Sequence, residues 1–365
     1  MSTPVSGSPP ALSTRFTELT GVRYPIVQTG MGWVSGARLT AATAAAGGLG
    51  IIASSTMSVP ELETAIRSVK ESTDAPFGVN IRSDGLDVGD RVDLMIRLGV
   101  KVASFALAPK KELLQKLKDA GVVTMPSVGA RRHAEKVAGW GADAVLVQGG
   151  EGGGHTGSVP TTLLLPQVVD AVDIPVVAAG GFFDGRGLVA ALAYGASAIG
   201  MGTRFLLTSD SNVSNDVKEI YLSTDVNGTI VTTAVDGVPH RVLRTELVDK
   251  LVKAGPIGRL PRAVRNAAAF RKESGTPWIS MLREGQAMKS GHELAWSQVI
   301  MAANTPMLLK ASMVDGRADL GLMTSGQVVG LIEDLPSVEE LISRIVREAG
   351  EVLERLTAKV PASKL

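Results

Sequence analysis

Short apolar runs rich in β-branched residues recur along the N-terminal half of the chain, and stretches with helical periodicity separate them. Runs of this kind are typical of parallel strands that are buried on both faces. They follow one another at intervals of roughly 20–30 residues, the length of one strand-and-helix unit. The eight runs are Tyr24–Thr29, Leu49–Ala53, Pro76–Asn80, Lys101–Phe105, Val122–Pro126, Asp143–Gln148, Ile174–Ala179 and Ser197–Met201. Eight units predict a closed (β/α)8 TIM barrel, with an open doubly wound sheet as the alternative.

Helix boundaries are expected at recurring residue types between these runs. Proline and small polar residues favour helix starts, and glycine favours the left-handed conformation that commonly ends a helix. The expected starts lie near Ser35, Pro60, Pro109, Ala130, Thr161 and Asp184. The expected stops are Gly47, Gly99, Gly121, Gly141 and Gly195.

The alternation of strands and helices stops after residue 226. The next 91 residues, 227–317, carry longer polar and basic helical stretches, so we expect a separate, mostly helical subdomain over the C-terminal face of the barrel. Further on, Leu335-Pro336-Ser337 opens an amphipathic pattern typical of a helix that returns to the barrel. The expected organisation is a disordered leader (1–13), a (β/α)8 barrel (14–226), a helical lid subdomain (227–317) and a C-terminal helical return to the barrel (318–365).

Composition excludes several classes of protein. The 365 residues are 45% hydrophobic, which suffices for a large core, and 37 basic residues balance 36 acidic ones. The net charge is therefore close to zero, and no overall electrostatic field attracts nucleic acid or an anionic membrane surface. The absence of cysteine excludes disulfides and thiol nucleophiles and favours a cytoplasmic location, and no metal site is expected. We identify neither a signal peptide at the N-terminus nor a run near the ~18 apolar residues of a membrane span.

Two glycine-rich turns follow the seventh and eighth predicted strands. They are Ala179-Gly180-Gly181 and Gly200-Met201-Gly202-Thr203. In TIM barrels the loops at these two places usually hold phosphate, and glycine lets backbone amides approach an anion. For either loop taken alone, the alternative is that its glycines only shape a tight turn. Because both glycine-rich loops follow neighbouring strands at the place where barrels hold phosphate, a phosphate-bearing cofactor is favoured.

The sixth predicted strand ends in the most unusual stretch of the chain, Gln148-Gly149-Gly150-Glu151-Gly152-Gly153-Gly154-His155. Such a density of glycine suggests that a flat ligand lies against bare backbone. His155 is one of only four histidines, and its place at a strand end favours a catalytic role over a structural one. The other three histidines, His133, His240 and His292, lie in helical or inserted context and are interpreted as structural.

Two further strand ends carry groups suited to a polar heterocycle. The first strand runs into Thr29-Gly30-Met31-Gly32, and the third ends at Asn80. Backbone groups and a side-chain amide can hydrogen-bond such a ring.

Six strings, in this order and spacing, resemble the nitronate monooxygenase (2-nitropropane dioxygenase) family of FMN enzymes: PIVQTGMGWV, AGGLGIIASS, PFGVN, GGEGGGHTG, PVVAAGGFFDG and AIGMGTRF. The wider group includes flavin-dependent enoyl reductases and NADH:quinone reductases. The resemblance implies that His155 is the active-site histidine. Together with the strand-end pattern it predicts FMN contacts at Thr29, Gly30, Met31, Gly32, Asn80, Gln148, Gly153, Gly154, Gly180, Gly181, Gly200, Met201, Gly202, Thr203 and Gln327.

The chain departs from nitronate-oxidising members of this family. Thr156 follows His155 where many relatives have arginine, and the only tyrosines are Tyr24, Tyr194 and Tyr221. No tyrosine of the C-terminal third can therefore surround a nitronate as in those relatives. A nitronate is not the substrate that we expect.

A basic stretch lies in the expected lid subdomain. Between residues 250 and 272 there are seven basic residues and no acidic one. A solvated helix face is one interpretation. The other is recognition of phosphate, on NAD(P)H, a CoA thioester or an acyl carrier protein, by Arg259, Arg262 and Arg265.

The expected function is that of an FMN-dependent oxidoreductase. NAD(P)H would reduce the flavin, which would pass hydride to a conjugated or CoA-linked carbonyl substrate, and the GGHTGSVPTTLLLPQVVDAV stretch resembles reductases of steroid-ring degradation. A nitronate monooxygenase is the main alternative. An IMP-dehydrogenase-like barrel is disfavoured because its chemistry needs a cysteine. If the protein is not an enzyme, the alternative is a barrel that binds a flavin or nucleotide without catalysis. A small-molecule substrate is expected, and a homodimer is allowed.

Overall fold

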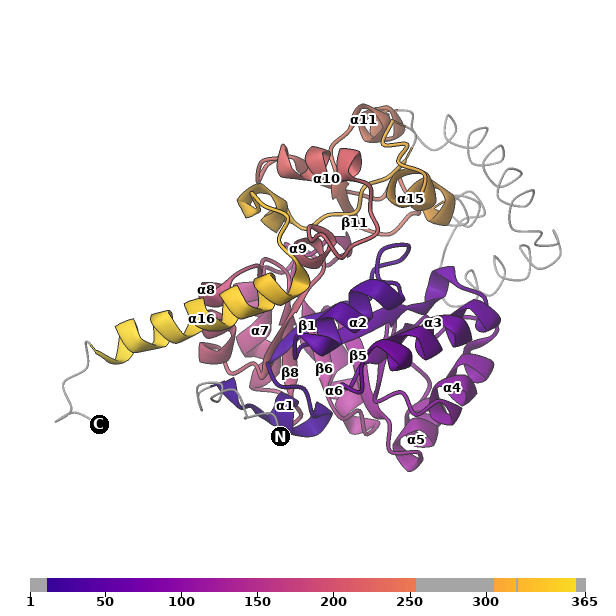
Figure 1. Cartoon of the computed structure of the whole chain (residues 1–365), viewed down its shortest axis with the longest axis vertical. Helices are drawn as coiled ribbons and strands as arrows, with labels where there is room; N and C mark the ends of the chain where they lie inside the picture. The colour runs from indigo at the N-terminus through magenta and orange to yellow at the C-terminus, as the bar shows by residue number, and fades with distance from the viewer. Residues whose placement is uncertain (1–11, 254–304, 320, 359–365) are drawn as a thin grey trace.

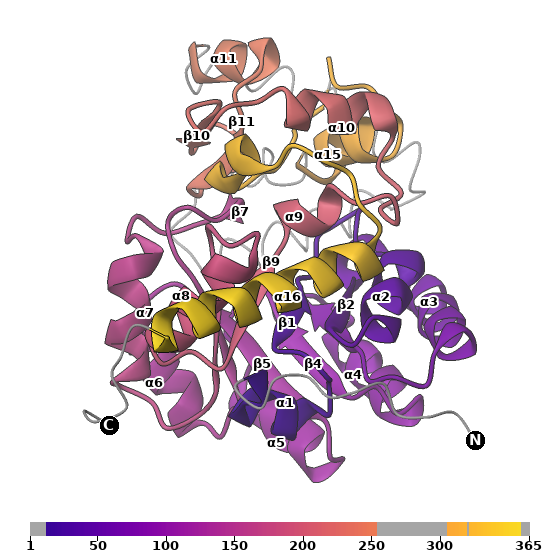
Figure 2. The ribbon, with the colours of Figure 1, turned by 60° about the vertical axis from the view of Figure 1, so that its left-hand side comes forward.

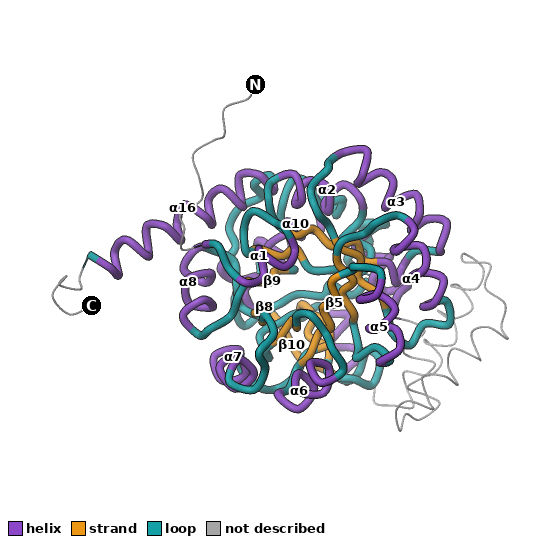
Figure 3. Tube along the Cα trace, turned by 90° about the horizontal axis from the view of Figure 1, so that it is seen from below, coloured by secondary structure: helices purple, strands orange, loops and turns teal. Residues whose placement is uncertain are grey.

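The computed structural model describes residues 12–253, 305–319 and 321–358, and its centre is a closed barrel of eight parallel strands. The closed ring is visible along the barrel axis in Figure 3. Each of the eight predicted runs contributes one strand, so the predicted barrel is confirmed. The strands are β1 (Ile26–Gln28), β2 (Leu49–Ala53), β3 (Gly78–Ile81), β4 (Val102–Phe105), β5 (Val123–Val128), β6 (Val145–Gln148), β8 (Val176–Ala179) and β9 (Ala198–Met201).

The first and last strands close the ring in register, with Ile26 opposite Ile199 and Gln28 opposite Met201. Alternate residues of each strand point into the barrel, where Leu49, Ile51 and Val102 belong to one apolar cluster. The short helix α1 (Arg15–Thr20) adds Phe16 to the same cluster and closes the N-terminal end of the barrel (Figure 1). The interior is therefore packed, and the site must lie at a rim.

Helices cover the outside of the barrel because the opposite face of each strand is also apolar. They are α2 (Ala37–Ala45), α3 (Val59–Ser72), α4 (Val88–Arg97), α5 (Lys111–Asp119), α6 (Arg131–Gly139), α7 (Thr161–Val169) and α8 (Gly185–Ala193). All five glycines predicted to end helices have positive φ, between 67° and 94°. Only glycine adopts that conformation without strain, so the chain turns there into the next strand.

The C-terminal helix α16 (Val338–Thr357) lies across the outside of the barrel, against α8 and α2 (Figure 2). Ser337 and Glu340 form its capping box, and Leu341, Ile342 and Ile345 are buried on one face. This is the helix that the amphipathic pattern after Leu335 predicted.

A second body of structure stands over the C-terminal ends of the strands (Figure 1). We call it the insertion. Its described elements are α10 (Asn215–Leu222), β10 (Thr229–Thr232), β11 (His240–Leu243), α11 (Glu246–Lys253), α15 (Thr305–Met313) and the 3-10 turn η3 (Gln327–Leu331). The short helix α9 (Thr203–Leu206) leads into it from β9.

The insertion contains a β-hairpin, β10–β11, that the sequence analysis did not predict. The strands read TIVT and HRVL, and neither has the continuous apolar run of the barrel strands or a strict alternation of apolar and polar positions. A small core of its own, including Val242, Val248 and Leu322, holds the hairpin against its neighbours. The predicted domain boundaries themselves stay predictions.

Among the described helices, we find none with both the length and the apolar character needed to cross a membrane.

Candidate active site at the C-terminal face of the barrel

The glycine-rich loop after β6 leaves the barrel and joins the sheet of the insertion. Its last two residues form β7 (Gly154–His155), which pairs antiparallel with β11. The pairing sets Gly154 opposite Arg241 and His155 opposite His240. A barrel loop thus supplies the edge strand of the three-stranded sheet β10-β11-β7. The position of His155 depends on both parts of the molecule.

Several glycines of this loop are required by neighbouring protein atoms. A Cβ on Gly153 would lie 2.6 Å from the carbonyl carbon of Ser325, and Gly154 has φ +74°. The sequence analysis attributed the glycines to a flat ligand. The structure adds a second reason, which is the close passage of the segment around Ser325 against the loop.

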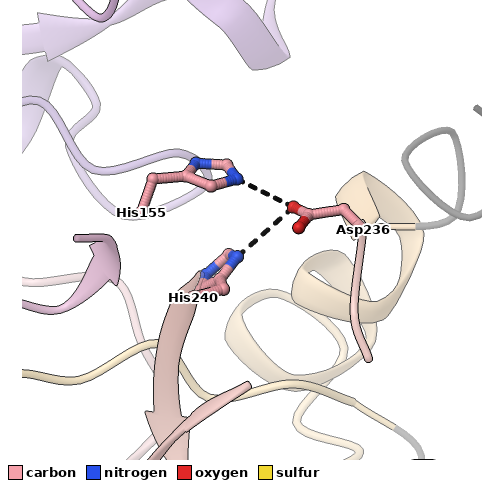
Figure 4. Close-up of side chains that lie close together, drawn as sticks. All are labelled: His155, Asp236 and His240. Carbon is pink, nitrogen blue, oxygen red and sulfur yellow. Dashed lines mark hydrogen bonds and ion pairs between the residues drawn. The ribbon is translucent and has the colours of Figure 1, made fainter. Parts of the chain in front are cut away.

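His155 contacts a carboxylate on the hairpin. Its Nε2 lies 2.8 Å from Oδ2 of Asp236, which stands in the turn between β10 and β11. A carboxylate only accepts hydrogen bonds, so a neutral His155 carries its proton on Nε2. Nδ1 is then left with a lone pair, on the side of the ring away from Asp236 in Figure 4. The His155 side chain is 58% exposed, so the ring is open to solvent.

His240 shares the same carboxylate. Its Nδ1 lies 3.4 Å from Oδ2 of Asp236, and its Nε2 lies 3.2 Å from Oγ1 of Thr324. The two imidazole rings lie side by side, with centroids 4.6 Å apart, because opposite residues of paired strands face the same side of a sheet. The sequence analysis interpreted His240 as structural, whereas the structure brings it into the site. His133 lies elsewhere, exposed on α6.

Asp236 is buried, with 6% of its side chain exposed. Burial alone would raise the pKa of Asp236, but the hydrogen bonds from His155 and His240 outweigh that effect and hold the pKa below its usual range. Its second oxygen accepts the backbone amide of Val238 at 3.2 Å. Asp236 is therefore an ionised group held in one orientation.

His155, Asp236 and His240 also offer three ligand atoms within 4.8 Å of one another, and zinc is bound by these residue types. The 2.8 Å approach of His155 to Asp236 is the length of a hydrogen bond. The expectation of no metal stays a prediction.

The predicted cofactor residues lie on loops that meet at this face. A Cβ on Gly30 would lie 2.6 Å from Cβ of Asn80, and one on Gly202 would lie 3.3 Å from both Met31 Sδ and Thr29 Oγ1. The loops after β1, β3 and β9 are therefore neighbours. Gly180, Gly181 and Gly200 lie at or directly after the ends of β8 and β9, beside this group.

The segment around Gln327 completes the group. The amide of Gly326 donates to Thr203 Oγ1 at 2.9 Å, and the amide of Gln327 donates to the Glu151 carbonyl at 2.9 Å. Gln148 donates from its side chain to the carbonyls of Gly153 and His155, at 3.1 and 3.0 Å. Its amide nitrogen thus shapes the glycine-rich loop.

Backbone amides among these loops differ in whether they already have a hydrogen-bond partner. The first amides of α8 already bind carboxylates, since Gly185 donates to Glu348 and Gly187 donates to Asp184, each at 2.9 Å. In contrast, no hydrogen bond among the described residues uses the amides of Gly181 and Gly202. Free amides on glycines can bind the phosphate of FMN. Glu151 lies close to Gly181, at 3.8 Å from the position of a Cβ there, but its carboxylate accepts hydrogen bonds from the amide and the hydroxyl of Thr161.

The three arginines predicted to bind substrate, Arg259, Arg262 and Arg265, lie outside the described residues. At the start of the basic stretch, Lys250 pairs with Glu246 on the exposed surface of α11. Sequence reasoning missed Asp236 altogether. The one available indication was its spacing of four residues before a rare histidine, in a glycine- and proline-containing turn.

A closed parallel barrel with an exposed histidine and a buried carboxylate at the C-terminal ends of its strands has the architecture of a TIM-barrel enzyme. The family model for nitronate monooxygenase matches residues 13–348. The chain belongs to this family and is an oxidoreductase.

Two relatives extend over nearly the whole chain. A Mycobacterium tuberculosis protein named (3aS,4S,5R,7aS)-5-hydroxy-7a-methyl-1-oxo-octahydro-1H-indene-4-carboxyl-CoA dehydrogenase is 62% identical over 96% of this chain and 99% of its own. A Rhodococcus jostii protein of the same name is 60% identical over 95% and 98%. Among solved structures, FabK from Thermotoga maritima is 35% identical, with a TM-score of 0.77 over 95% of this chain and 99% of its own.

Proposed function

We propose that this protein is an FMN-dependent dehydrogenase of a CoA thioester whose acyl group is a saturated, fused two-ring acid. The observation that carries the proposal is the His155–Asp236 pair at the mouth of the barrel. The substrate class comes from the name of the relatives that are 62% and 60% identical. A methylated two-ring ketone of this kind has the skeleton of steroid rings C and D, which supports the expected place in steroid-ring catabolism.

The reaction that we propose is oxidation of the bond between the α- and β-carbons of the thioester. The α-hydrogen is the most acidic carbon-bound hydrogen beside a thioester, so its removal needs a base. Nδ1 of His155 accepts this proton, and Asp236 stabilises the imidazolium that results. The α-carbon's electron pair forms the new double bond as hydride leaves the β-carbon. Reduction of a conjugated thioester is the reverse of the same step.

FMN, when bound, supplies the acceptor for that hydride. The amides of Gly181 and Gly202 would hold its phosphate, and Asn80 and the loop from Thr29 to Gly32 would contact its polar groups. The site suits one phosphate, and the first strand-to-helix turn lacks the GxGxxG pattern of dinucleotide-binding folds. We propose NAD(H) or NADP(H) as the redox partner of the flavin.

The basic stretch supports recognition of CoA. Replacing Arg259, Arg262 and Arg265 together by glutamine is expected to raise KM for the acyl-CoA about tenfold and to weaken its salt dependence, with kcat and the flavin spectrum unchanged. Steady-state kinetics at two ionic strengths measure this. Unchanged KM would assign the stretch to a solvated helix face.

One anaerobic experiment tests the proposed function. The purified yellow protein is mixed in turn with a bicyclic acyl-CoA, NADH, NADPH and a nitronate, and the flavin absorbance is followed. We expect the saturated acyl-CoA and one nicotinamide to bleach the flavin. Bleaching by the nitronate alone would overturn the proposal in favour of nitronate oxidation. A colourless protein that binds no FMN would show that the proposed flavin dependence is wrong.

A further inference from the structure

We propose that Asp236 and His240 are positioning residues that keep the proton of His155 on Nε2, so that Nδ1 is the atom that takes the substrate proton. The inference rests on the proposed function for its kinetic consequences. Its structural content, the tautomer of one imidazole, does not depend on any substrate.

The hydrogen bonds of Asp236 support this assignment. Oδ2 faces Nε2 of His155 and Nδ1 of His240, while Oδ1 accepts the amide of Val238. All three partners are nitrogens, and a carboxylate can serve them only as acceptor. Burial removes water as a competing donor, because only 6% of the Asp236 side chain is exposed. A His155 with its proton on Nδ1 would set two lone pairs against each other at 2.8 Å.

His240 holds the carboxylate from the other side. Its ring is fixed between Asp236 and Oγ1 of Thr324, and its backbone is fixed by the pairing with His155. The segment after Thr324 runs past Gly153 of the glycine-rich loop. His240 therefore links the carboxylate to the same segment that touches the predicted cofactor loop.

The two distances predict unequal effects. The 2.8 Å bond between His155 and Asp236 is the stronger, and becomes charge-assisted when His155 takes up a proton. The 3.4 Å contact of His240 lies at the long end of hydrogen-bond distances. Loss of Asp236 should thus cost more rate than loss of His240. Neither residue touches the reacting carbon, so KM and FMN content should stay near those of the parent.

The first test reads the tautomer directly. The FMN-loaded protein is labelled with ¹⁵N-histidine, and long-range ¹H–¹⁵N spectra of its four imidazoles are recorded at neutral pH without substrate. A His155→Ala spectrum assigns the resonances. We expect His155 in the Nε2–H form in the parent and a mixture in Asp236→Asn, whose amide can either accept or donate. A parent His155 in the Nδ1–H form would overturn the proposal, whatever the variants do.

The second test is kinetic. Asp236→Asn is expected to lower the rate of flavin bleaching by acyl-CoA about 10²–10⁴-fold, the range seen when a catalytic histidine loses its carboxylate or its proton-transfer role. His240→Ala is expected to lower it about tenfold, with partial rescue in His240→Asn, whose amide can replace one donor. Bleaching by the nicotinamide should stay unchanged in all three.

Matched controls separate this role from general damage. Asp249→Asn removes an exposed carboxylate of the same insertion, paired with Arg244, and His133→Asn removes an exposed histidine of α6. Both should keep parent rates. Parent rates in Asp236→Asn would overturn the proposal. If the parent itself does not oxidise acyl-CoA, the proposed function fails, and the tautomer measurement still decides the positioning role.

Discussion

The barrel loops and the insertion contribute different chemical groups to the site. The barrel contributes mainly backbone, because its strand ends carry glycines whose amides and close packing suit a flat, phosphate-bearing cofactor. The insertion contributes ionisable side chains, Asp236 and His240, on a hairpin with a core of its own. His155 belongs to the barrel in sequence and to the insertion's sheet in space. Cofactor binding and proton transfer should therefore fail separately when one part is changed.

The largest effect is expected on the barrel side, from Gly180→Asp. Gly180 has φ +98°, and a Cβ there would lie 3.0 Å from Thr161 Oγ1. The new carboxylate would also repel a phosphate held by the adjacent amides. We expect FMN content below a tenth of the parent's, measured from the ratio of flavin to protein absorbance. Gly350→Asp, where a Cβ would meet nothing within 4 Å, is the control and should keep its flavin.

The next largest effect isolates the base. His155→Ala should keep bound FMN, and NADH or NADPH should reduce that flavin at a near-parent rate. The variant should oxidise acyl-CoA about 10²–10⁴-fold more slowly than the parent, the usual scale for a lost general base. Stopped-flow absorbance resolves the two half-reactions. Equal slowing of both would mean that the histidine serves flavin binding or access instead of proton transfer, and the contrast between the two regions would disappear.

A smaller effect is expected where the two regions join. Arg241 on β11 donates to Thr229 Oγ1 at 2.8 Å and to the carbonyl of Gly150, in the glycine-rich loop, at 2.9 Å. Arg241→Met removes both bonds and keeps the aliphatic stem, so we expect a loss of about 1–3 kcal/mol in the free energy of unfolding. Urea unfolding measures it. Arg244→Met, which breaks only an exposed ion pair with Asp249, should cost under about 1 kcal/mol.

The smallest effect concerns pH. The pKa of Asp236 lies below its usual range in the folded protein, so the unfolded chain binds a proton there first as pH falls. The stability that this carboxylate contributes is therefore complete above its unfolded pKa of about 4 and is lost as pH falls through the lower folded value. The stability difference between the parent and Asp236→Asn should accordingly shrink in urea unfolding series taken from about pH 5 to below pH 4. A difference that does not shrink over this range would contradict the assigned charge state.

Local regularities explain why much of the fold was predictable. Each strand of the barrel has enough β-branched residues between glycine stops to be recognised, and the repetition of eight such units specifies closure. The same reasoning located His155 and the glycine turns, because in a parallel barrel every strand end reaches the same face. It did not find β10 and β11, which are as short as several barrel strands but contain Thr, His and Arg in place of a continuous apolar run.

By itself, then, the sequence determined the barrel and the position of His155 after its sixth strand, while the role of His155 stays a prediction. Tertiary structure alone decided which nitrogen of His155 faces a carboxylate. Asp236 lies 81 residues further along the chain, and no local pattern relates two residues whose contact depends on the pairing of β7 with β11. Strand pairing at that separation depends on the packing of the whole insertion over the barrel mouth, because short strands gain their stability from what covers them.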